Sequence, residues 1–292
     1  MSSNPTTQLP YRKKSLWMNA WKRLTKNRMA MLGLGIISLF IFAAIFADYI
    51  APYRYDEQHL DKIFQFPNKE FLLGTDQNGR DILSRIIYGA RISLQVGFIS
   101  VAISAVLGCG LGSVAGYYGD KIDNVIMRVM DVLMAIPNVL LAIVIATTLG
   151  PGLQNLMIAV GISSVPSFAR LIRASILSVK GQEFVEAARL VGCSDARIIF
   201  RHLIPNVLAP IIVQITLSMA LSILAASTLS FLGLGIQPPI PEWGAMLSSG
   251  RMYIMDYWYL VTFPGIAIAI IILALNLLGD GLRDALDPRM KK

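Results

Sequence analysis

Six apolar runs, each long enough to cross a lipid bilayer, constrain this chain more than any other feature. They lie near residues 30–50, 93–117, 132–150, 154–172, 207–232 and 259–279. A helix needs about 20 apolar residues to span the hydrocarbon core. No water is available there, so backbone polar groups must bond within the segment itself, as they do in a helix. The pattern predicts an all-α polytopic membrane protein with six transmembrane helices.

The composition agrees with this class and excludes a soluble globular domain. Hydrophobic residues make up 55% of the chain, charged residues only 15%, and the mean hydropathy is +0.59. The formal charge of +8 could suggest a nucleic-acid partner. The placement of the basic residues explains that charge better, so we expect no nucleic acid.

Lys and Arg are unequally divided between the two sides of the predicted spans. With the N-terminus inside, the inner segments hold 19 of these residues and the outer segments hold seven. We therefore expect both termini in the cytoplasm, with some basic residues contacting anionic membrane lipid. The predicted parts are a cytoplasmic N-terminal arm (1–28), a first transmembrane helix (29–50), an extracytoplasmic loop (51–91), a core of five transmembrane helices (92–280) and a cytoplasmic tail (281–292).

Small residues recur every four positions in the second apolar run. They are Ser100, Ser104, Gly108, Gly112 and Gly116. Such a stripe lies on one face of a helix and lets another helix approach closely. We predict that these residues pack two spans together.

Prolines and a few polar residues interrupt the apolar runs. Pro137, Pro166 and Pro264 are expected to kink or locally open their helices. Gln214 and Asn276 lie deepest in the runs, whereas Asp131, Gln154 and Asn155 are expected near an interface. Polar groups at membrane depth face a bundle interior or a water-filled path. Gln214 and Asn276 are therefore translocation-path candidates, and a buried interhelical hydrogen bond explains each equally well.

Residues of catalytic or metal-binding type are sparse. The sequence has no G-x-x-x-x-G-K-[ST] phosphate loop, and neither of its two histidines has companions at ligand or triad spacing. Four charged residues in the outer loop, Asp76, Arg80, Asp81 and Arg85, fit a solvated helical face at least as well as a substrate site. We expect no catalytic residue, no metal site and no cofactor in this chain.

The segment GQEFVEAARLVGCSDARIIFRHLIPNVLAP (181–210) is the longest interruption between apolar runs in the second half of the chain. Phe184, Ala187, Ala188 and Val191 recur at helical spacing, and Gly192 suits the left-handed position after a helix. A second helix would follow, capped by Ser194 or Asp195, with Ile198, Ile199, Leu203 and Ile204 on its apolar face; Pro205 would then prevent a simple continuation. The pattern predicts a compact helical knob between two spans.

This segment resembles the EAA loop of ATP-binding-cassette importer permeases. The matching residues are Glu186, Ala187, Ala188, Gly192, Ile204 and Pro205, whereas His202 stands where the family usually has an aliphatic residue. The resemblance implies a type I importer fold in which the loop at 181–206 is a coupling helix that docks on a separate ATPase. An ordinary amphipathic hairpin on the bilayer surface is the plainer alternative.

Three other stretches resemble dipeptide and oligopeptide importer permeases: LGTDQNGRDILSRIIYGARISLQVG (73–97), SFLGLGIQPPIPEWGAML (230–247) and NLLGDGLRDALDPR (276–289). Together the matches point to the C-type permease of a peptide or nickel importer. They imply a second permease subunit, two cytoplasmic ATPases that bind ATP and Mg²⁺, an extracytoplasmic substrate-binding protein, and a bacterial or archaeal cytoplasmic membrane. Dipeptides or short oligopeptides are the expected substrates, with nickel chelates or glutathione as alternatives.

Two other functions remain open from the residues themselves. An ion-coupled secondary transporter would need ionisable residues deep in the spans and an internal repeat. A membrane scaffold would explain the helix packing and the knob, but not the spans rich in Gly and Pro.

Overall fold

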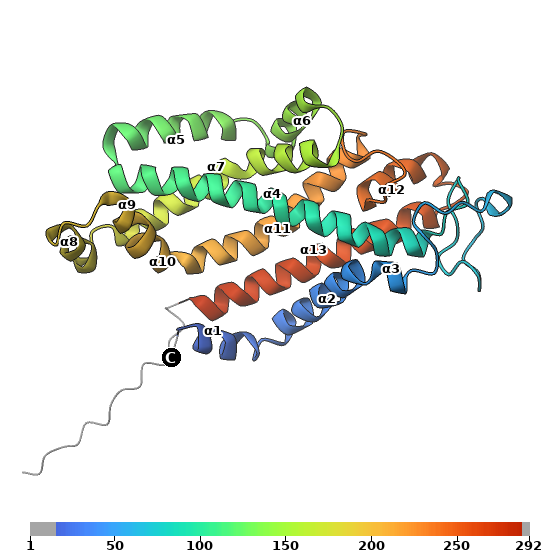
Figure 1. Cartoon of the computed structure of the whole chain (residues 1–292), viewed down its shortest axis with the longest axis horizontal. Coiled ribbons are helices and arrows are strands. Elements are labelled where there is room, and N and C mark those ends of the chain that lie inside the picture. Colours follow the sequence, from blue (N-terminus) through green and yellow to red (C-terminus); the bar gives the residue numbers. More distant parts are fainter. Residues whose placement is uncertain (1–15, 288–292) are drawn as a thin grey trace, which may run out of the picture.

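The computed structural model describes residues 16–287 as a bundle of helices elongated along one axis (Figure 1). The predictions for residues 1–15 and 288–292 lie outside this range. In chain order the elements are α1 (Leu16–Leu24), α2 (Arg28–Ile45), α3 (Ala47–Ile50), η1 (Leu60–Lys62), α4 (Ile82–Tyr118), α5 (Asp120–Met134), α6 (Asn138–Leu149), α7 (Leu153–Val179), α8 (Glu183–Leu190), α9 (Asp195–Arg197), η2 (Ile198–Leu203), α10 (Ile204–Asn206), α11 (Leu208–Phe231), α12 (Trp243–Gly250), η3 (Arg251–Tyr253) and α13 (Tyr259–Leu286).

Five of these helices are long and apolar enough to cross a membrane alone: α2, α4, α7, α11 and α13. Helices α5 and α6 together are long and apolar enough for a sixth crossing. Their axes differ by 89° across a short break, so this crossing would be a broken span. The all-α polytopic fold is thus confirmed. The interruption expected at Pro137 in the third span is present, since α5 ends at Met134 and α6 begins only after Pro137; α5 also begins earlier than the expected residue 132, at Asp120. Pro166 and Pro264, in contrast, lie inside unbroken helices.

Several helix ends differ from the expected ones. The first span ends at Ile45, and a separate turn, α3, follows it. Helix α4 begins at Ile82 rather than near residue 93, because Asp81 caps it by accepting a hydrogen bond from the backbone N–H of Ser84. Helices α7 and α13 continue past the expected ends, to Val179 and Leu286. Polar last turns of a helix carry no hydropathy signal, so apolar runs underestimate helix length.

The core is divided among several apolar clusters rather than gathered in one centre. One joins α2, α4, α11, α12 and α13, with Trp243 and Tyr259 fully buried in it. A second joins α4, α6, α7 and α11 around Leu156 and Leu229. A third lies beneath the segment 183–206 and includes Ile172 and Ile198. Consequently each end of the bundle has its own packed support.

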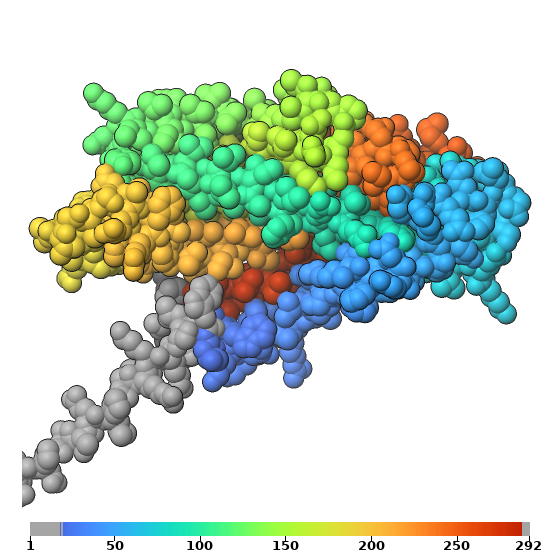
Figure 2. Space-filling model, viewed as in Figure 1, coloured from blue at the N-terminus to red at the C-terminus, as the bar shows by residue number. Residues whose placement is uncertain are grey.

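The two ends of the bundle differ in character. One end carries α1, the end of α13 and the knob, which we define as residues 183–206 (Figure 1). The opposite end carries α12 and the polar segment, which we define as residues 51–81. In the space-filling view the knob protrudes as a yellow lobe and the polar segment forms the cyan-blue opposite end (Figure 2).

Candidate functional site

The knob begins with α8, whose end is shaped by a glycine. Gly192 has φ = +78°, and the N–H groups of Gly192 and Cys193 donate to the carbonyls of Arg189 and Ala188 at 2.9 and 3.1 Å. These bonds satisfy carbonyls at the helix end, and the left-handed backbone favours glycine. The sharp turn expected at Gly192 is therefore present, and it reverses the chain into α9.

The second half of the knob is held down by buried aliphatic residues. Ile198, Ile199 and Leu203 lie in a π-helical turn and are buried. Pro205 lies in α10, a single turn that ends before α11 begins at Leu208. Ile204 is half-buried beside it. A π-turn widens the helix locally, which changes the face that each following side chain occupies.

A polar contact fixes the knob to the end of α4. The hydroxyl of Tyr117 donates to Oδ1 of Asp195 at 2.7 Å, and the guanidinium of Arg189 lies 5.3 Å from the centre of the Tyr117 ring. One α4 side chain thus contacts both halves of the knob. This arrangement couples the position of the knob to that of the longest helix.

The outward face of the knob is unusually apolar. Leu190, Val191 and Phe200 are 88%, 78% and 70% exposed. The four apolar residues at helical spacing do not share one face of α8: Ala188 is buried with Val185, whereas Ala187 and Val191 are exposed. Large exposed apolar side chains beside polar ones are typical of a docking surface.

Glu186 lies on this outward face. It is exposed, and within residues 16–287 its carboxylate has no hydrogen-bond or ion-pair partner. The side chain of its neighbour Ala187 is a single methyl group, so it does not block access to the Glu186 carboxylate. An acidic group beside an apolar patch can therefore be reached from outside the chain.

The small-residue stripe of α4 faces α7. Ser100 and Ser104 are fully buried, and the hydroxyl of Ser100 donates to the carbonyl of Met157 at 3.1 Å. A Cβ added to Gly116 would lie 2.9 Å from Cβ of Ile176. Added to Gly108 or Gly112, it would collide with α7 at Phe168 or Ala169. The two backbones approach so closely at these three positions that only glycine fits, so α4 and α7 form one closely packed pair.

The structure separates the two residues suggested for a translocation path. Gln214 is half-buried in α11, donates to the hydroxyl of Ser218 at 3.0 Å, and lines a groove that Arg283 of α13 also lines. Asn276 is exposed on α13 and does not line that groove. Gln214 therefore combines a hydrogen bond along its own helix with access to an open groove.

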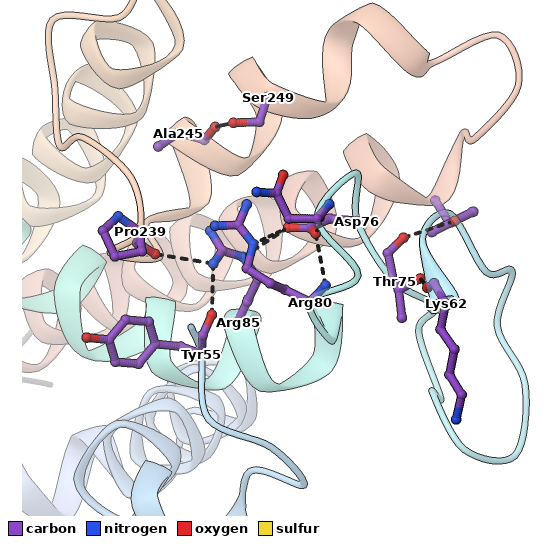
Figure 3. Close-up of polar contacts among 11 residues, drawn as sticks. Tyr55, Lys62, Thr75, Asp76, Arg80, Arg85, Pro239, Ala245 and Ser249 are labelled. Atoms are coloured by element: carbon purple, nitrogen blue, oxygen red, sulfur yellow. Dashed lines mark hydrogen bonds and ion pairs between the residues drawn. The ribbon is translucent and has the colours of Figure 1, made fainter. Parts of the chain in front are cut away.

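The charged cluster of the outer loop is buried, which excludes the solvated helical face that was one of its two explanations. Asp76, Arg80, Asp81 and Arg85 are at most 7% exposed, and the first three precede α4 (Figure 3). Oδ2 of Asp76 accepts from Nε of Arg80 at 2.7 Å and lies 3.7 Å from Nε of Arg85. Segments distant in sequence cover these groups, and the alternating charges alone gave no sign of that.

Arg85 joins three parts of the chain at this end. Its Nη1 donates to the carbonyl of Tyr55 at 2.9 Å and to that of Pro239 at 3.2 Å (Figure 3). Tyr55 belongs to the polar segment and Pro239 to the loop before α12. The hydroxyl of Tyr259 adds a further contact by donating to the carbonyl of Thr75 at 3.1 Å. Together these bonds fix the polar segment to α12 and α13.

Glu242 is a buried acidic residue that sequence reasoning did not single out. It is 1% exposed and caps α12, accepting from the N–H groups of Gly244 and Ala245 at 2.9 Å each. Burial raises the pKa of the Glu242 carboxyl, and the hydrogen bonds from Gly244 and Ala245 partly oppose that rise. An acidic residue just before Trp-Gly-Ala could have indicated a helix N-cap.

Family models match most of the chain. Residues 108–292 match the model described as "Binding-protein-dependent transport system inner membrane component". Residues 15–67 match the model described as "N-terminal TM domain of oligopeptide transport permease C". The second match covers α1 to η1, and the first begins within α4 and includes the knob.

Relatives share nearly half of their residues with this chain. The "Dipeptide transport system permease protein DppC" of Alkalihalophilus pseudofirmus is 49% identical over 99% of this chain and 95% of its own length. The "Di/tripeptide transport system permease protein DppC" of Pseudomonas aeruginosa is 47% identical over 93% and 91%. The "Glutathione transport system permease protein GsiD" of Escherichia coli is 46% identical over 94% and 91%.

Solved structures share the fold at low sequence identity. An inward-facing form of the MetNI methionine ABC transporter has a TM-score of 0.57 at 17% identity, covering 70% of this chain and 96% of its own. An amino acid ABC transporter with histidines has a TM-score of 0.54 at 19% identity, covering 69% and 94%. Since one family model covers more than half of the sequence and relatives match it almost end to end, the chain belongs to the family of inner membrane components of binding-protein-dependent transport systems.

Proposed function

We propose that this chain is one permease subunit of an ATP-driven importer that carries dipeptides or short oligopeptides across a bacterial or archaeal cytoplasmic membrane. The observation that supports it most is the near end-to-end similarity to dipeptide permeases. In this proposal the knob and both termini face the cytoplasm, and the polar segment faces outward. The excess of Lys and Arg on the knob side supports that orientation.

The knob is the proposed contact with a cytoplasmic ATPase. Leu190, Val191 and Phe200 offer an apolar surface, and Glu186 is free to pair with a basic group of the partner. Two ATPase subunits would bind ATP and Mg²⁺, so this chain itself holds no cofactor and performs no hydrolysis. A second permease subunit and an extracytoplasmic binding protein would complete the complex.

Movement of the ATPases would pass through the knob to the spanning helices. Tyr117 links both halves of the knob to α4, and the glycine stripe fixes α4 to α7. A displacement at the knob would therefore shift α4 and α7 as one rigid body, and access to a central path would switch sides. Gln214, on an open groove, is the better path candidate of the two, because Asn276 lies outside that groove.

Glutathione is the alternative substrate that one comparison favours. A glutathione permease is 46% identical to this chain, close to the values for dipeptide permeases. Nickel chelates remain the other alternative. In such systems most of the substrate specificity resides in the separate binding protein, so the helices of this chain need only provide a path for the substrate.

Uptake by cells that express the complete transporter tests this function. Cells auxotrophic for an amino acid are supplied with it only as a dipeptide, and growth is compared with and without this chain. Growth that depends on the chain and stops when ATP is depleted supports the proposal. Growth unaffected by deletion of the chain, or uptake of glutathione alone, would contradict the peptide assignment.

A further inference from the structure

The two buried arginines of the polar end share one acidic ion-pair partner. Asp76 is the acidic partner of both Arg80 and Arg85. Asp81 forms no ion pair with either of them; its Oδ2 accepts from the N–H and the hydroxyl of Ser84, and its Oδ1 has no hydrogen-bond partner among residues 16–287. A buried positive charge without a partner is costly.

The hydrogen bonds of the two side chains are unequal. Arg85 has backbone carbonyl partners at Tyr55 and Pro239, so its role as a link between segments explains its burial. Arg80 uses only Nε, toward Asp76. Among residues 16–287 no acceptor serves its two terminal nitrogens, although its side chain is 6% exposed. Bonds to distant segments, which explain the burial of Arg85, therefore do not explain the burial of the Arg80 side chain.

A pocket lies where these donors are unused. Its cavity volume is about 20 Å³, which is room for a water-sized species, and its polar lining includes Asp76, Gln77, Arg80, Arg85 and Ser249. Apolar side chains from α4, α12 and α13 close it: Ile82, Met246 and Leu260. Ser249 already donates to the carbonyl of Ala245 (Figure 3), so the open donors are the nitrogens of the arginines and the amide of Gln77, whose Oε1 is buried without a partner among residues 16–287. Planar guanidinium groups match carboxylates in shape and charge.

We propose that this pocket binds a small monovalent anion, a carboxylate group or a halide, between Arg80 and Arg85. The anion would neutralise the unmatched charge and accept from the unused nitrogens of Arg80. It would thereby hold the polar segment against α12 and α13. Two sources share this chemistry: a free ion from solution, and the terminal carboxylate of a peptide. The assignment does not depend on the proposed transport function.

Thermal unfolding of the intact complex in mild detergent tests the site. Sodium acetate or bromide is titrated at constant ionic strength against a bulky sulfonate salt. A site that binds only the folded state gives a saturable rise in the unfolding midpoint, of at least about 2 °C here. Arg80→Gln should abolish the rise. Arg54→Gln should keep it, because Arg54 belongs to the same segment but is 74% exposed and pairs with Asp56.

A second measurement keeps the proposal testable if Arg80→Gln fails to fold. Crystals of the unaltered complex grown in bromide should show an anomalous peak beside Arg80. An empty pocket in those crystals, together with equal responses to every salt, would overturn the proposal. The source follows from a third comparison: a rise with a dipeptide but not with its C-terminal amide identifies a peptide carboxylate, whereas a rise with halide alone identifies a free ion.

Discussion

Glycine serves opposite purposes in the α4–α7 contact and in the knob. Gly112 has ordinary helical φ, and a side chain there would collide with the backbone of α7. Gly192 has φ = +78°, and nothing lies within 4 Å of a Cβ added to it. The first glycine is required by a neighbour and the second by its own backbone. The contrast separates a rigid, closed contact from an open surface that has room for a partner.

The largest effect is expected where the contact is closed. Gly112→Val should lower the free energy of unfolding by about 3 kcal/mol or more, since α7 cannot retreat without losing the rest of the stripe. Gly110→Val is the matched control on the same helix, because nothing lies within 4 Å of that position. Thermal unfolding in detergent compares them. Equal midpoints for the two variants would show that the contact is not tight.

Glu242 tests a buried site that depends on charge rather than on volume. Glu242→Ala should cost about 1 kcal/mol, because α12 loses its cap. The native carboxyl has a pKa above its ordinary 4.5, so the folded state binds the proton more tightly than the unfolded state. The stability of the native protein should therefore fall as pH rises from 4.5 until the raised pKa is passed.

The control for this pH effect is Glu242→Gln. It keeps a side-chain carbonyl for the cap and has no proton to lose, so the fall in stability with pH should be smaller than in the native protein. Unfolding midpoints measured from acid to neutral pH give the comparison. Identical pH dependence in both proteins would show that Glu242 does not titrate in this range.

A loss of stability smaller than that of Gly112→Val is expected at Gly192. Gly192→Val forces a side chain into the left-handed region and should cost about 1–2 kcal/mol. The protein should still reach the membrane, while uptake is uncoupled from ATP hydrolysis. Peptide uptake and ATPase activity are measured on the same vesicles. Normal uptake by this variant would count against a coupling role of the knob.

The smallest effect on stability is expected on the exposed face of the knob. Leu190→Ser should change the free energy of unfolding by no more than about 0.5 kcal/mol, because Leu190 is 88% exposed. Uptake should nevertheless fall sharply. Unfolding and uptake are measured together, with Met255→Ser as a control that is 93% exposed at the opposite end. Equal uptake by the Leu190→Ser and Met255→Ser variants would show that the exposed face of the knob is no more important for transport than the opposite end of the bundle.

Features that depend on local sequence were predictable, and those that depend on distant segments were not. The apolar runs predicted the spanning helices, and Gly192 predicted the turn of the knob, because length and backbone preference act locally. Pro137 marked the break between α5 and α6, but the 89° change of direction follows from how α6 packs on α7 and α11. The π-turn at Ile198–Leu203 was likewise invisible in the spacing of its residues.

The charged cluster shows the same limit more clearly. Alternating Asp and Arg residues resemble a solvated helix when read alone. In the structure α12, α13 and the loop before α12 cover these residues. Pro239 of that loop contacts Arg85, 154 residues away in the sequence. Glu242 was overlooked for the same reason, since its burial depends on the packing of α12. Burial of polar groups is a property of the assembled bundle.

Recovery of ATPase subunits with the tagged chain tests the central claim, that the exposed face of the knob docks on an ATPase. The native chain, Leu190→Asp and Met255→Asp are purified in mild detergent under the same conditions. We expect ATPase subunits to be recovered with the native chain and with Met255→Asp, and to be lost with Leu190→Asp. Equal recovery of ATPase subunits with all three chains would contradict it.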